Sequence, residues 1–315
     1  MTIVTNTLTT FSAIGNREDL ADTIYNIAPV EVPLQSMAQK AKASAVFHEW
    51  QTEVLNAAAT NAQLQGDDFT YGASIVTTRV GNRTQIMRKE AVISGTQEAV
   101  NKAGRQSEVV RQLMNKSKEL KRDIEFALCS NQAPVTGNTA VAPQLRPLLS
   151  WFNTNVDMGV GGVNGTPTTA RTDGTQRPMT ETLLQTAMQN AWINGGSPDY
   201  ALTGPKQKRG ISAFTGGTTK FYKVEDRKLT ATIDVYVGDF GQLKIVASRF
   251  VRGAATAADR CVHVLDPSLI GIATLRPIKT IDVAPTGDAE KAVILTELTL
   301  EVRQEAGLAL IADLV

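Results

Sequence analysis

Between Gln97 and Leu128 the chain contains no proline, and apolar or small residues recur at steps of three and four. This spacing places them on one face of a helix and leaves the charged residues on the other. Ser94 and Gln97 can form a capping box at the start, and Ser130 shortly precedes a proline, which favours an end there. The pattern therefore predicts one long helix over 94–130. Its inner face would comprise Ala103, Val110, Leu113, Ser117, Leu120, Ile124 and Ala127.

The outer face of this predicted helix is charged. Glu108 lies on it, and the pairs Glu119/Arg122 and Lys121/Glu125 have the spacing that brings opposite charges together. Over the proline-free stretch from Gln97 to Leu128, this helix would be roughly 45–50 Å long at ~1.5 Å per residue. Two interpretations fit: a long amphipathic core helix, or the spine of an elongated subunit whose other parts attach to copies of itself.

The N-terminal 45 residues have the pattern of an arm. A short helix is expected from Arg17, with Leu20, Ile24 and Ile27 on one face, and two prolines then force residues 30–34 to run extended. Thirty extended residues can reach ~100 Å. Apolar side chains on such an arm need a docking surface elsewhere, for example on a neighbouring subunit.

Residues 46–92 have the pattern of a two-stranded ribbon. Apolar and polar residues alternate over 46–54, and residues 74–80 are rich in strand-forming residues. Gly81-Asn82 is a turn signal, and a further strand is expected over 84–89. The residues between Asn56 and Asp68 have the composition of a mobile tip. Because isolated ribbons are marginal in water, this one is expected to be supported by another chain.

The rest of the chain mixes helices and strands without a βαβ repeat, which predicts an α+β fold. The elements expected are a packed segment over Leu145–Phe152, a helix over Glu181–Trp192, a strand over Tyr200–Thr203, a short helix over Pro205–Arg209, a hairpin turning at Gly238–Gly241, a buried strand over Cys261–Leu265, and long strands over Pro277–Val283 and Ala292–Val302.

Composition narrows the classes of function. With 32 basic and 31 acidic residues the net charge is +1, so the whole chain gives no electrostatic reason to bind nucleic acid or an acidic membrane. We expect no signal peptide and no membrane span. The two cysteines, Cys129 and Cys261, are expected to be reduced and buried, in a protein that folds in the cytoplasm.

No set of residues has the spacing of a catalytic, metal or cofactor site. His263 lies in an apolar run and His48 beside Trp50, so packing roles are expected for both; Cys261 and His263 alone make no zinc site. The run Gly159–Gly165 lacks the third Rossmann glycine and the Gly-Lys-Ser/Thr of a P-loop, and is expected to be a flexible loop.

Two small charged clusters allow two interpretations each. Asp67 and Asp68 could hold a cation, or lie at a solvated loop tip. Lys206, Lys208 and Arg209 could be a solvated helix face, or contact phosphate or carboxylate groups at a subunit junction.

Short motifs in a fixed order span nearly the whole chain. In order they are Asp22–Pro29 with Pro33-Leu34, Phe47–Gln51, Gly238–Gly241 with Ser248-Arg249, Leu275–Pro277, and Thr286–Lys291 running into Glu297–Glu301. With the succession of arm, ribbon, long helix, α/β region and returning strands, they resemble the major capsid (major head) proteins of tailed bacteriophages, which have the Hong Kong 97-type fold.

The resemblance implies a domain plan. It consists of an N-terminal arm (1–45), an extended loop (46–92), a peripheral domain (93–178 and 276–315) that contains the spine helix, and an axial domain (179–275), whose loops would crowd around five- and six-fold axes. It also implies a structural protein without enzymatic activity or cofactor, which assembles through pentamers and hexamers into an icosahedral head around double-stranded DNA.

The expected partners are many copies of this chain, with portal, scaffold and decoration proteins as further candidates, and DNA contacted without sequence specificity. Assembly in the host cytoplasm, and no membrane contact, are expected. The candidate contacts between subunits are Ile24, Tyr25, Val32, Leu34, Trp50, Asp67, Asp68, Tyr71, Lys206, Lys208 and Arg209. Two alternatives stay open: an encapsulin-like shell that encloses cargo, and a hydrolase with an unrecognised site.

Overall fold

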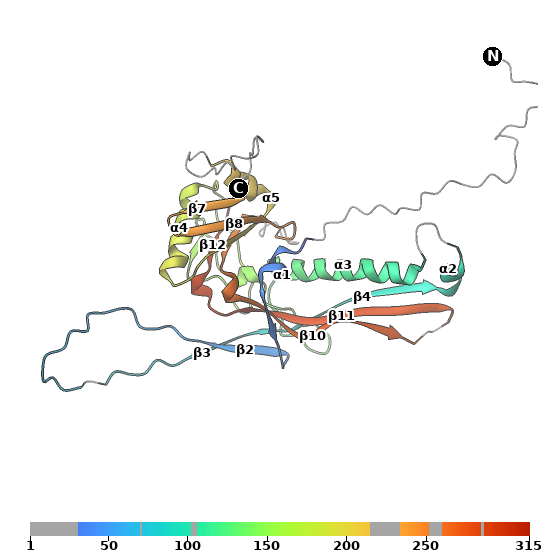
Figure 1. Ribbon diagram of the computed structural model, residues 1–315, viewed down its shortest axis with the longest axis horizontal. Helices are drawn as coiled ribbons and strands as arrows, with labels where there is room; N and C mark the ends of the chain where they lie inside the picture. Colours follow the sequence, from blue (N-terminus) through green and yellow to red (C-terminus); the bar gives the residue numbers. More distant parts are fainter. Residues whose placement is uncertain (1–30, 70, 102–105, 215–233, 252–259, 285–286) are drawn as a thin grey trace, which may run out of the picture.

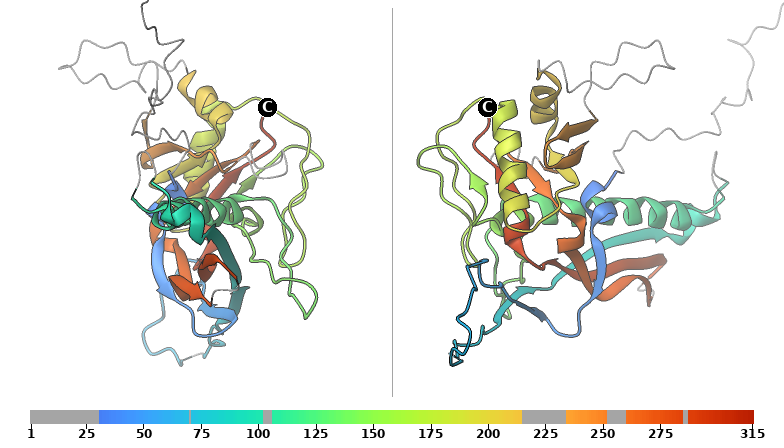
Figure 2. Two further views of the ribbon diagram at one scale, coloured as in Figure 1. Left: turned by 90° about the vertical axis from the view of Figure 1, so that its right-hand side faces the viewer. Right: turned by 60° about the vertical axis from the view of Figure 1, so that its left-hand side comes forward.

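The computed structural model describes residues 31–69, 71–101, 106–214, 234–251, 260–284 and 287–315. A compact unit at one end carries a long helix that lies along a sheet, and a thin ribbon projects from the base of the molecule (Figure 1). Figure 2 shows the same arrangement from two other sides, with the ribbon separate from the compact unit. The molecule is therefore elongated, as the spine interpretation predicted.

The four-stranded sheet has the order β1-β10-β11-β4 and supports the long helix α3 (Figure 1). β1 runs parallel to β10, whereas β10, β11 and β4 are antiparallel neighbours. The strands are β1 (Gln39–Lys42), β4 (Gln85–Ser94), β10 (Ile270–Val283) and β11 (Ala289–Val302). The helices beside them are α1 (Pro33–Met37), α2 (Gly95–Ala99) and α3 (Glu108–Cys129).

The compact unit is built on a six-stranded sheet of the order β5-β12-β9-β6-β8-β7. Its strands are β5 (Val156–Asp157), β6 (Tyr200–Thr203), β7 (Val235–Gly238), β8 (Gly241–Ala247), β9 (Val262–Leu265) and β12 (Ala309–Ile311). The helices are α4 (Glu181–Ile193) and α5 (Pro205–Ser212). The sequence predicted α4, α5, the β7–β8 hairpin and the buried strand β9 correctly, and Thr180 caps α4 by accepting from the Leu183 amide at 3.4 Å.

One hydrophobic cluster joins the two sheets. The segment predicted as packed, Leu145–Phe152, contributes Leu148, Trp151 and Phe152, and these lie with Leu120 of α3 and Leu310 of β12 in the same cluster. The compact unit and the long helix therefore share a core, which makes their relative placement a property of the folded subunit.

The predicted single helix over 94–130 is wrong at its N-terminal end, because two caps divide it. The Ser94 hydroxyl accepts from the Gln97 amide at 3.3 Å and starts α2, and the Ser107 hydroxyl accepts from the Val110 amide at 3.3 Å and starts α3. α3 then has 22 residues, about 33 Å at ~1.5 Å each. Ala103 lies outside the described residues; Leu120, Ile124 and Ala127 are buried as predicted, whereas Val110 is exposed.

Two acidic residues assigned to the outer face of the helix are buried, and the predicted ion pairs do not form. Glu108 is buried and pairs with Arg111 at the first turn. Glu119 pairs with Lys116 at 2.9 Å, one turn earlier, instead of with Arg122. Glu125 is fully buried against the arm rather than paired with Lys121.

The turn predicted at Gly81-Asn82 is also wrong, because both residues lie within β3 (Thr78–Arg83). The Asn82 side chain is buried and donates to the backbone oxygens of Arg146 (3.1 Å) and Leu300 (2.8 Å). This clamp holds the strand where a solvent-exposed turn was expected. The chain then leaves the ribbon, and β4 joins the four-stranded sheet instead of continuing the ribbon to residue 92.

Residues 30–34 do not all run extended, since α1 begins at Pro33.

The sheets also divide the chain differently from the expected domain plan. β5 and β12, from segments assigned to the peripheral domain, lie in the six-stranded sheet, and β10 begins at Ile270, inside the segment assigned to the axial domain.

His263 is a core histidine, as predicted, and it makes the subunit sensitive to acid. Its side chain is buried beside Phe152, and its Nδ1 lies 3.3 Å from the Leu202 oxygen. Burial, ahead of other causes, lowers the pKa of His263 from 6.5 to about 4. Between these two pH values the unfolded chain binds the proton and the native one does not, so stability falls as the pH is lowered from 6.5 to 4.

We therefore expect protonation of His263 to lower the free energy of unfolding by up to about 3 kcal/mol between pH 6.5 and 4. This follows from a value of ~1.4 kcal/mol per unit of pKa difference between the folded and unfolded states. Urea unfolding of unassembled subunit between pH 4 and 7 measures it. A His263→Leu variant has no such titration, so the difference in unfolding free energy between wild type and variant should change with pH. A difference that stays constant from pH 4 to 7 would contradict a neutral buried histidine.

Candidate functional site: the surfaces for assembly

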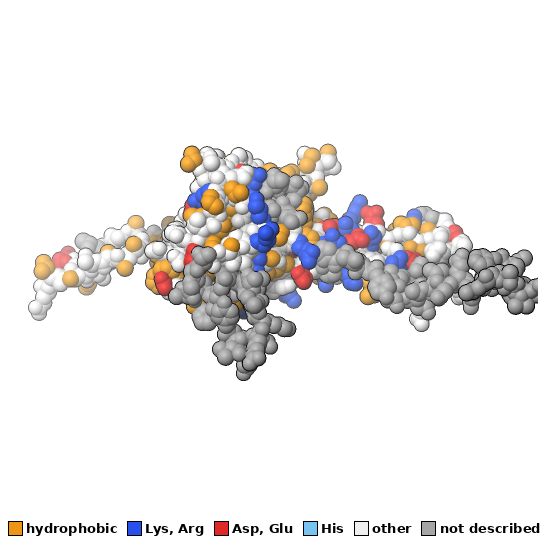
Figure 3. Space-filling view, turned by 90° about the horizontal axis from the view of Figure 1, so that it is seen from above, with side chains coloured by type: hydrophobic (Ala, Val, Ile, Leu, Met, Phe, Trp, Pro, Cys, Tyr) orange, Lys and Arg blue, Asp and Glu red, His pale blue; other side chains and the backbone are white. Residues whose placement is uncertain are grey.

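The ribbon presents apolar side chains that no other described part of its own subunit covers. β2 (Phe47–Thr52) and β3 pair along their whole length, from Phe47 opposite Arg83 to Thr52 opposite Thr78. Beyond this pairing the chain forms a wide loop, seen at the lower left of Figure 1. The large apolar side chains exposed on it are Val54, Leu55, Leu64, Phe69, Tyr71, Ile75 and Val76, with Phe69 83% and Tyr71 93% exposed. Orange atoms follow the projecting ribbon in Figure 3 as well.

The base of the ribbon, in contrast, is fixed to the subunit. Trp50 donates its Nε1 proton to the Val302 oxygen at 3.0 Å, and its ring lies 5.5 Å from that of Trp151. His48 Nε2 lies 3.2 Å from a Glu301 carboxylate oxygen. The ribbon is thus held at one end and exposed at the other, a geometry suited to reaching a second molecule.

The exposed loop is also acidic. Glu53, Asp67 and Asp68 lie in it, and residues 53–77 include no lysine or arginine. Asp67 and Asp68 are exposed, and each accepts a hydrogen bond from the next residue's amide at 2.9 Å. This fits the solvated tip that the sequence allowed.

The outer surface of α3 has the opposite character. Val110, Met114, Lys118 and Lys121 are all exposed, and their spacing places them along one side of the helix. We call these four residues the α3 ridge. It is apolar in its first half and basic in its second.

The arm reaches its own subunit at Glu125. A Glu125 carboxylate oxygen accepts from the Leu34 amide at 2.7 Å, and the other accepts from the Gln35 amide (3.1 Å) and the Gln35 side chain (3.0 Å). Burial raises the pKa of Glu125, and these hydrogen bonds oppose that shift. Glu125 therefore satisfies the first amides of α1 and fixes this short helix against α3.

Replacing Glu125 by Leu should destabilise the subunit by about 2–4 kcal/mol, because buried amide donors of α1 lose their acceptor. Glu125→Gln keeps one acceptor oxygen and matches the neutral carboxyl that burial favours, so we expect a smaller loss. Chemical unfolding of unassembled subunit measures both. Equal losses for the two variants would argue against the hydrogen-bonding role.

The three residues of the predicted basic cluster, Lys206, Lys208 and Arg209, do not all point to solvent. Lys206 and Arg209 are exposed on α5, one turn apart. Lys208 turns inward and donates to Asp234 (3.0 Å) and to the Ile245 oxygen (2.9 Å). Lys208 is therefore held by its own subunit, whereas Lys206 and Arg209 are available to a partner.

The other predicted contact residues fall in three groups. Ile24 and Tyr25 lie outside the described residues. Asp67, Asp68 and Tyr71 are exposed on the ribbon, and Val32 is partly buried. Leu34 is fully buried in the core of its own subunit and Trp50 packs against it, so both stabilise the monomer instead. The role of Leu34 was predicted wrongly because its hydrogen-bond partner, Glu125, lies 91 residues away in the sequence. No residue near Leu34 indicates this contact.

Catalytic and metal chemistry finds no support in the described part of the chain. No three His, Cys, Asp or Glu side chains there are close enough together to hold a metal ion. Both cysteines are free and buried, and burial raises the pKa of the Cys261 thiol to about 12, so it is not a nucleophile. Among the described helices, none has the length and apolar character needed to span a bilayer.

A projecting ribbon, a long helix on a four-stranded sheet, and a compact unit on a second sheet together define the Hong Kong 97-type fold of tailed-phage capsid proteins. The predicted α+β class and fold are therefore confirmed. The chain belongs to the SU10 major capsid protein family, whose sequence profile matches residues 3–315. Members of this family are structural proteins, which confirms the expectation that the chain is not an enzyme.

Individual relatives agree with the family. Over 120 residues the chain is 34% identical to the major capsid protein of Escherichia phage Phieco32; the match spans 38% of this chain and about a third (34%) of that protein's length. Solved structures share the fold at low sequence identity. The capsid of a native GTA particle matches with a TM-score of 0.64 and 8% identity, over 97% of this chain and 98% of that one. The capsid of cyanophage P-SCSP1u has a TM-score of 0.62 and 13% identity (99% and 97% of the two chains), and that of Myoviridae phage XM1 a TM-score of 0.61 and 9% identity (94% and 96%).

Proposed function

We propose that this protein is the shell subunit of a tailed-phage head, and that it assembles through pentamers and hexamers into an icosahedral particle around double-stranded DNA. The observation that carries the proposal is the ribbon: its base is fixed, but its apolar side chains, Phe69 and Tyr71 above all, are uncovered. Exposed apolar surface of this kind marks a binding site. A second copy of the chain covers it.

The docking surface for the ribbon is the α3 ridge of a neighbouring subunit. Phe69 and Tyr71 pack against its apolar half, Val110 and Met114, while Asp67 and Asp68 approach the basic half. Charge complementarity sets the register of such a contact, and apolar burial supplies most of its free energy. A contact that buries ~1,000 Å² of apolar surface gives ~25 kcal/mol before the cost of association.

The parts of the subunit have distinct roles in this proposal. The arm crosses to neighbours, the ribbon is the extended loop, the four-stranded sheet with α3 is the peripheral domain, and the compact unit is the axial domain beside the five- and six-fold axes. The balanced charge suits a DNA container, since a strongly basic wall would bind DNA and resist its packaging. Assembly takes place in the host cytoplasm, and portal, scaffold and decoration proteins complete the head.

Negative-stain microscopy of the purified full chain tests the proposal. Closed particles or rings of five and six subunits are expected on concentration, and nucleic acid should be present in particles recovered from infected cells. Particles that hold a protein cargo and no DNA would favour the encapsulin-like alternative. A protein that stays monomeric over a wide range of salt and concentration would overturn the proposal.

A further inference from the structure

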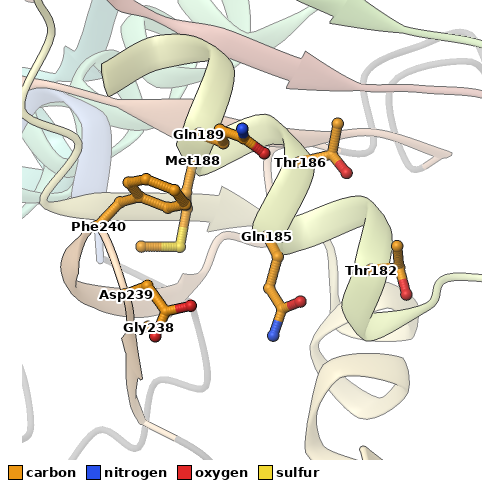
Figure 4. A pocket seen from close by; sticks show the side chains of 8 residues that line it. All are labelled: Thr182, Gln185, Thr186, Met188, Gln189, Gly238, Asp239 and Phe240. Carbon is orange, nitrogen blue, oxygen red and sulfur yellow. The ribbon is translucent and has the colours of Figure 1, made fainter. Parts of the chain in front are cut away.

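A hollow of about 310 Å³ lies on the compact unit, between α4 and the turn that joins β7 to β8 (Figure 4). Gln185, Met188 and Gln189 line it from the helix, and Asp239 and Phe240 from the turn. Its size is at the lower end for ligand pockets, so it fits one side chain better than a cofactor. The ribbon proposal does not use it.

The lining of this hollow is suited to a cation on an alkyl stem. Asp239 is exposed at its edge and supplies a carboxylate, the glutamine amides supply acceptor oxygens, and Phe240 supplies an aromatic face. Gln185 donates to the Tyr236 hydroxyl at 3.0 Å, which donates to Glu181 at 3.1 Å, so the helix side is fixed. No lysine or arginine is among its lining residues.

The surroundings of the hollow have two further marks of an interface. Trp192 and Ile193, at the end of α4, are 56% and 62% exposed, and the Trp192 ring lies 5.6 Å from that of Phe240. An exposed tryptophan beside a hollow is typical of the centre of a protein–protein contact. Burial raises the pKa of Tyr236, and its hydrogen bond to Glu181 and the negative charges of Glu181 and Asp239 raise it further.

The same chain presents a matching group on another side of the compact unit. Arg209 and Lys206 are exposed on α5, and within the described part of the chain neither has an acidic residue within ion-pair distance. In Figure 1 α4 lies at the left edge of the compact unit and α5 on its right. Figure 3, seen from above, shows Lys and Arg side chains gathered in a narrow line across this unit.

We infer that the hollow takes Arg209 from α5 of an adjacent copy, with Lys206 at the rim, and so forms a head-to-tail contact that closes the ring of axial domains. The guanidinium stacks on Phe240 and pairs with Asp239, and Trp192 packs against the stem. The hollow and α5 are different surfaces of the subunit. Each copy can therefore use its hollow to bind one neighbour and its α5 to bind the other, which is the head-to-tail geometry that a closed ring requires. This inference rests on the proposed shell function and names one contact within it.

Charge reversal tests the pairing. Asp239→Arg and Arg209→Asp should each lower particle yield at least tenfold, and the double variant should restore it to within about threefold of wild type. Both substitutions lie at exposed positions, and the melting temperature of the unassembled subunit checks that each variant folds. A control, Lys279→Asp at an exposed position of β10 combined with Asp239→Arg, should give no rescue. Failure of the double variant to recover any yield would overturn the inference.

Cross-linking tests the geometry. The variant for this experiment is Asp239→Cys/Arg209→Cys. The two native cysteines are buried, so a bismaleimide reagent reacts only with the two introduced cysteines. A bismaleimide is used because a direct disulfide would need the two Cα atoms within ~7 Å. Assembled particles should give a denatured ladder that ends at five and six chains. Dimers alone, or a link within one chain, would overturn the inference. If the variant forms particles that give no ladder, this contact is excluded but the proposed shell function still holds. If the wild-type chain forms no particles, the proposed shell function is wrong.

Discussion

Leu120→Asp is expected to prevent the accumulation of soluble subunit. Leu120 is fully buried in the cluster that α3 shares with Leu145, Leu148 and Leu298. A carboxylate there loses the burial of leucine and must either stay charged without a partner or take up a proton. Together these costs are about 5 kcal/mol or more, close to the whole stability of a typical domain. The soluble fraction after expression, measured on a gel, gives the result.

The exposed side of the same helix provides the control. Met114 is 58% exposed, six residues before Leu120, so Met114→Asp should leave the subunit soluble and folded. Leu113 is only partly buried, and Leu113→Asp should be intermediate. A soluble Leu120→Asp subunit that still forms particles would mean that the assignment of the buried face of α3 is wrong.

Deleting residues 56–68 is expected to leave a folded monomer that assembles poorly. The β2–β3 pairing ends at Thr52 and Thr78, and the residues that remain between these are enough to connect two antiparallel strands. The contacts that hold the base of the ribbon, Trp50 to Val302 and Asn82 to Leu300, are untouched. What is lost is part of the exposed apolar surface and both aspartates of the tip. Particle yield should fall at least tenfold, whereas the melting temperature of the unassembled subunit should change by a few degrees at most.

A matched variant separates loop length from loop chemistry. Leu64→Ser/Asp67→Ser/Asp68→Ser keeps every backbone atom of the ribbon and removes the large apolar side chain and both carboxylates that the deletion removes, so it should reproduce most of the assembly defect. Circular dichroism and a thermal melt establish that each variant is folded. Unchanged particle yield and stability after the deletion would contradict the role of the ribbon in assembly.

Much of this fold is predictable because it depends on local pattern. The apolar stripe of α3 from Leu120 onward, the capped helix α4, the β7–β8 hairpin and the buried strand β9 all follow from short-range spacing and turn residues. The order of motifs also led to the correct fold. The exposed acidic tip of the ribbon was identified from composition alone.

The incorrect predictions concern residues whose partners are remote in sequence. Asn82 resembles a turn residue, yet Arg146 and Leu300 bury it; Glu125 resembles a solvated helix residue, yet Leu34 and Gln35 bury it. Sequence separations of 64 to 218 residues leave no periodic signal. The hollow beside Asp239 was missed for the same reason, since it forms only when the β7–β8 turn packs on α4.

The clamp at the base of the ribbon has a consequence for synthesis on the ribosome. The ribbon is complete once Arg83 has been translated, but the groups that hold it, Glu301 and Val302, follow more than 200 residues later. At ~5–20 residues per second the apolar ribbon is exposed on the nascent chain for roughly 10–40 s. During that time it can meet the ribbons of other growing chains. We therefore expect translation speed and chaperone supply, as well as the sequence of the subunit, to limit how much of it a host cell delivers in a usable state.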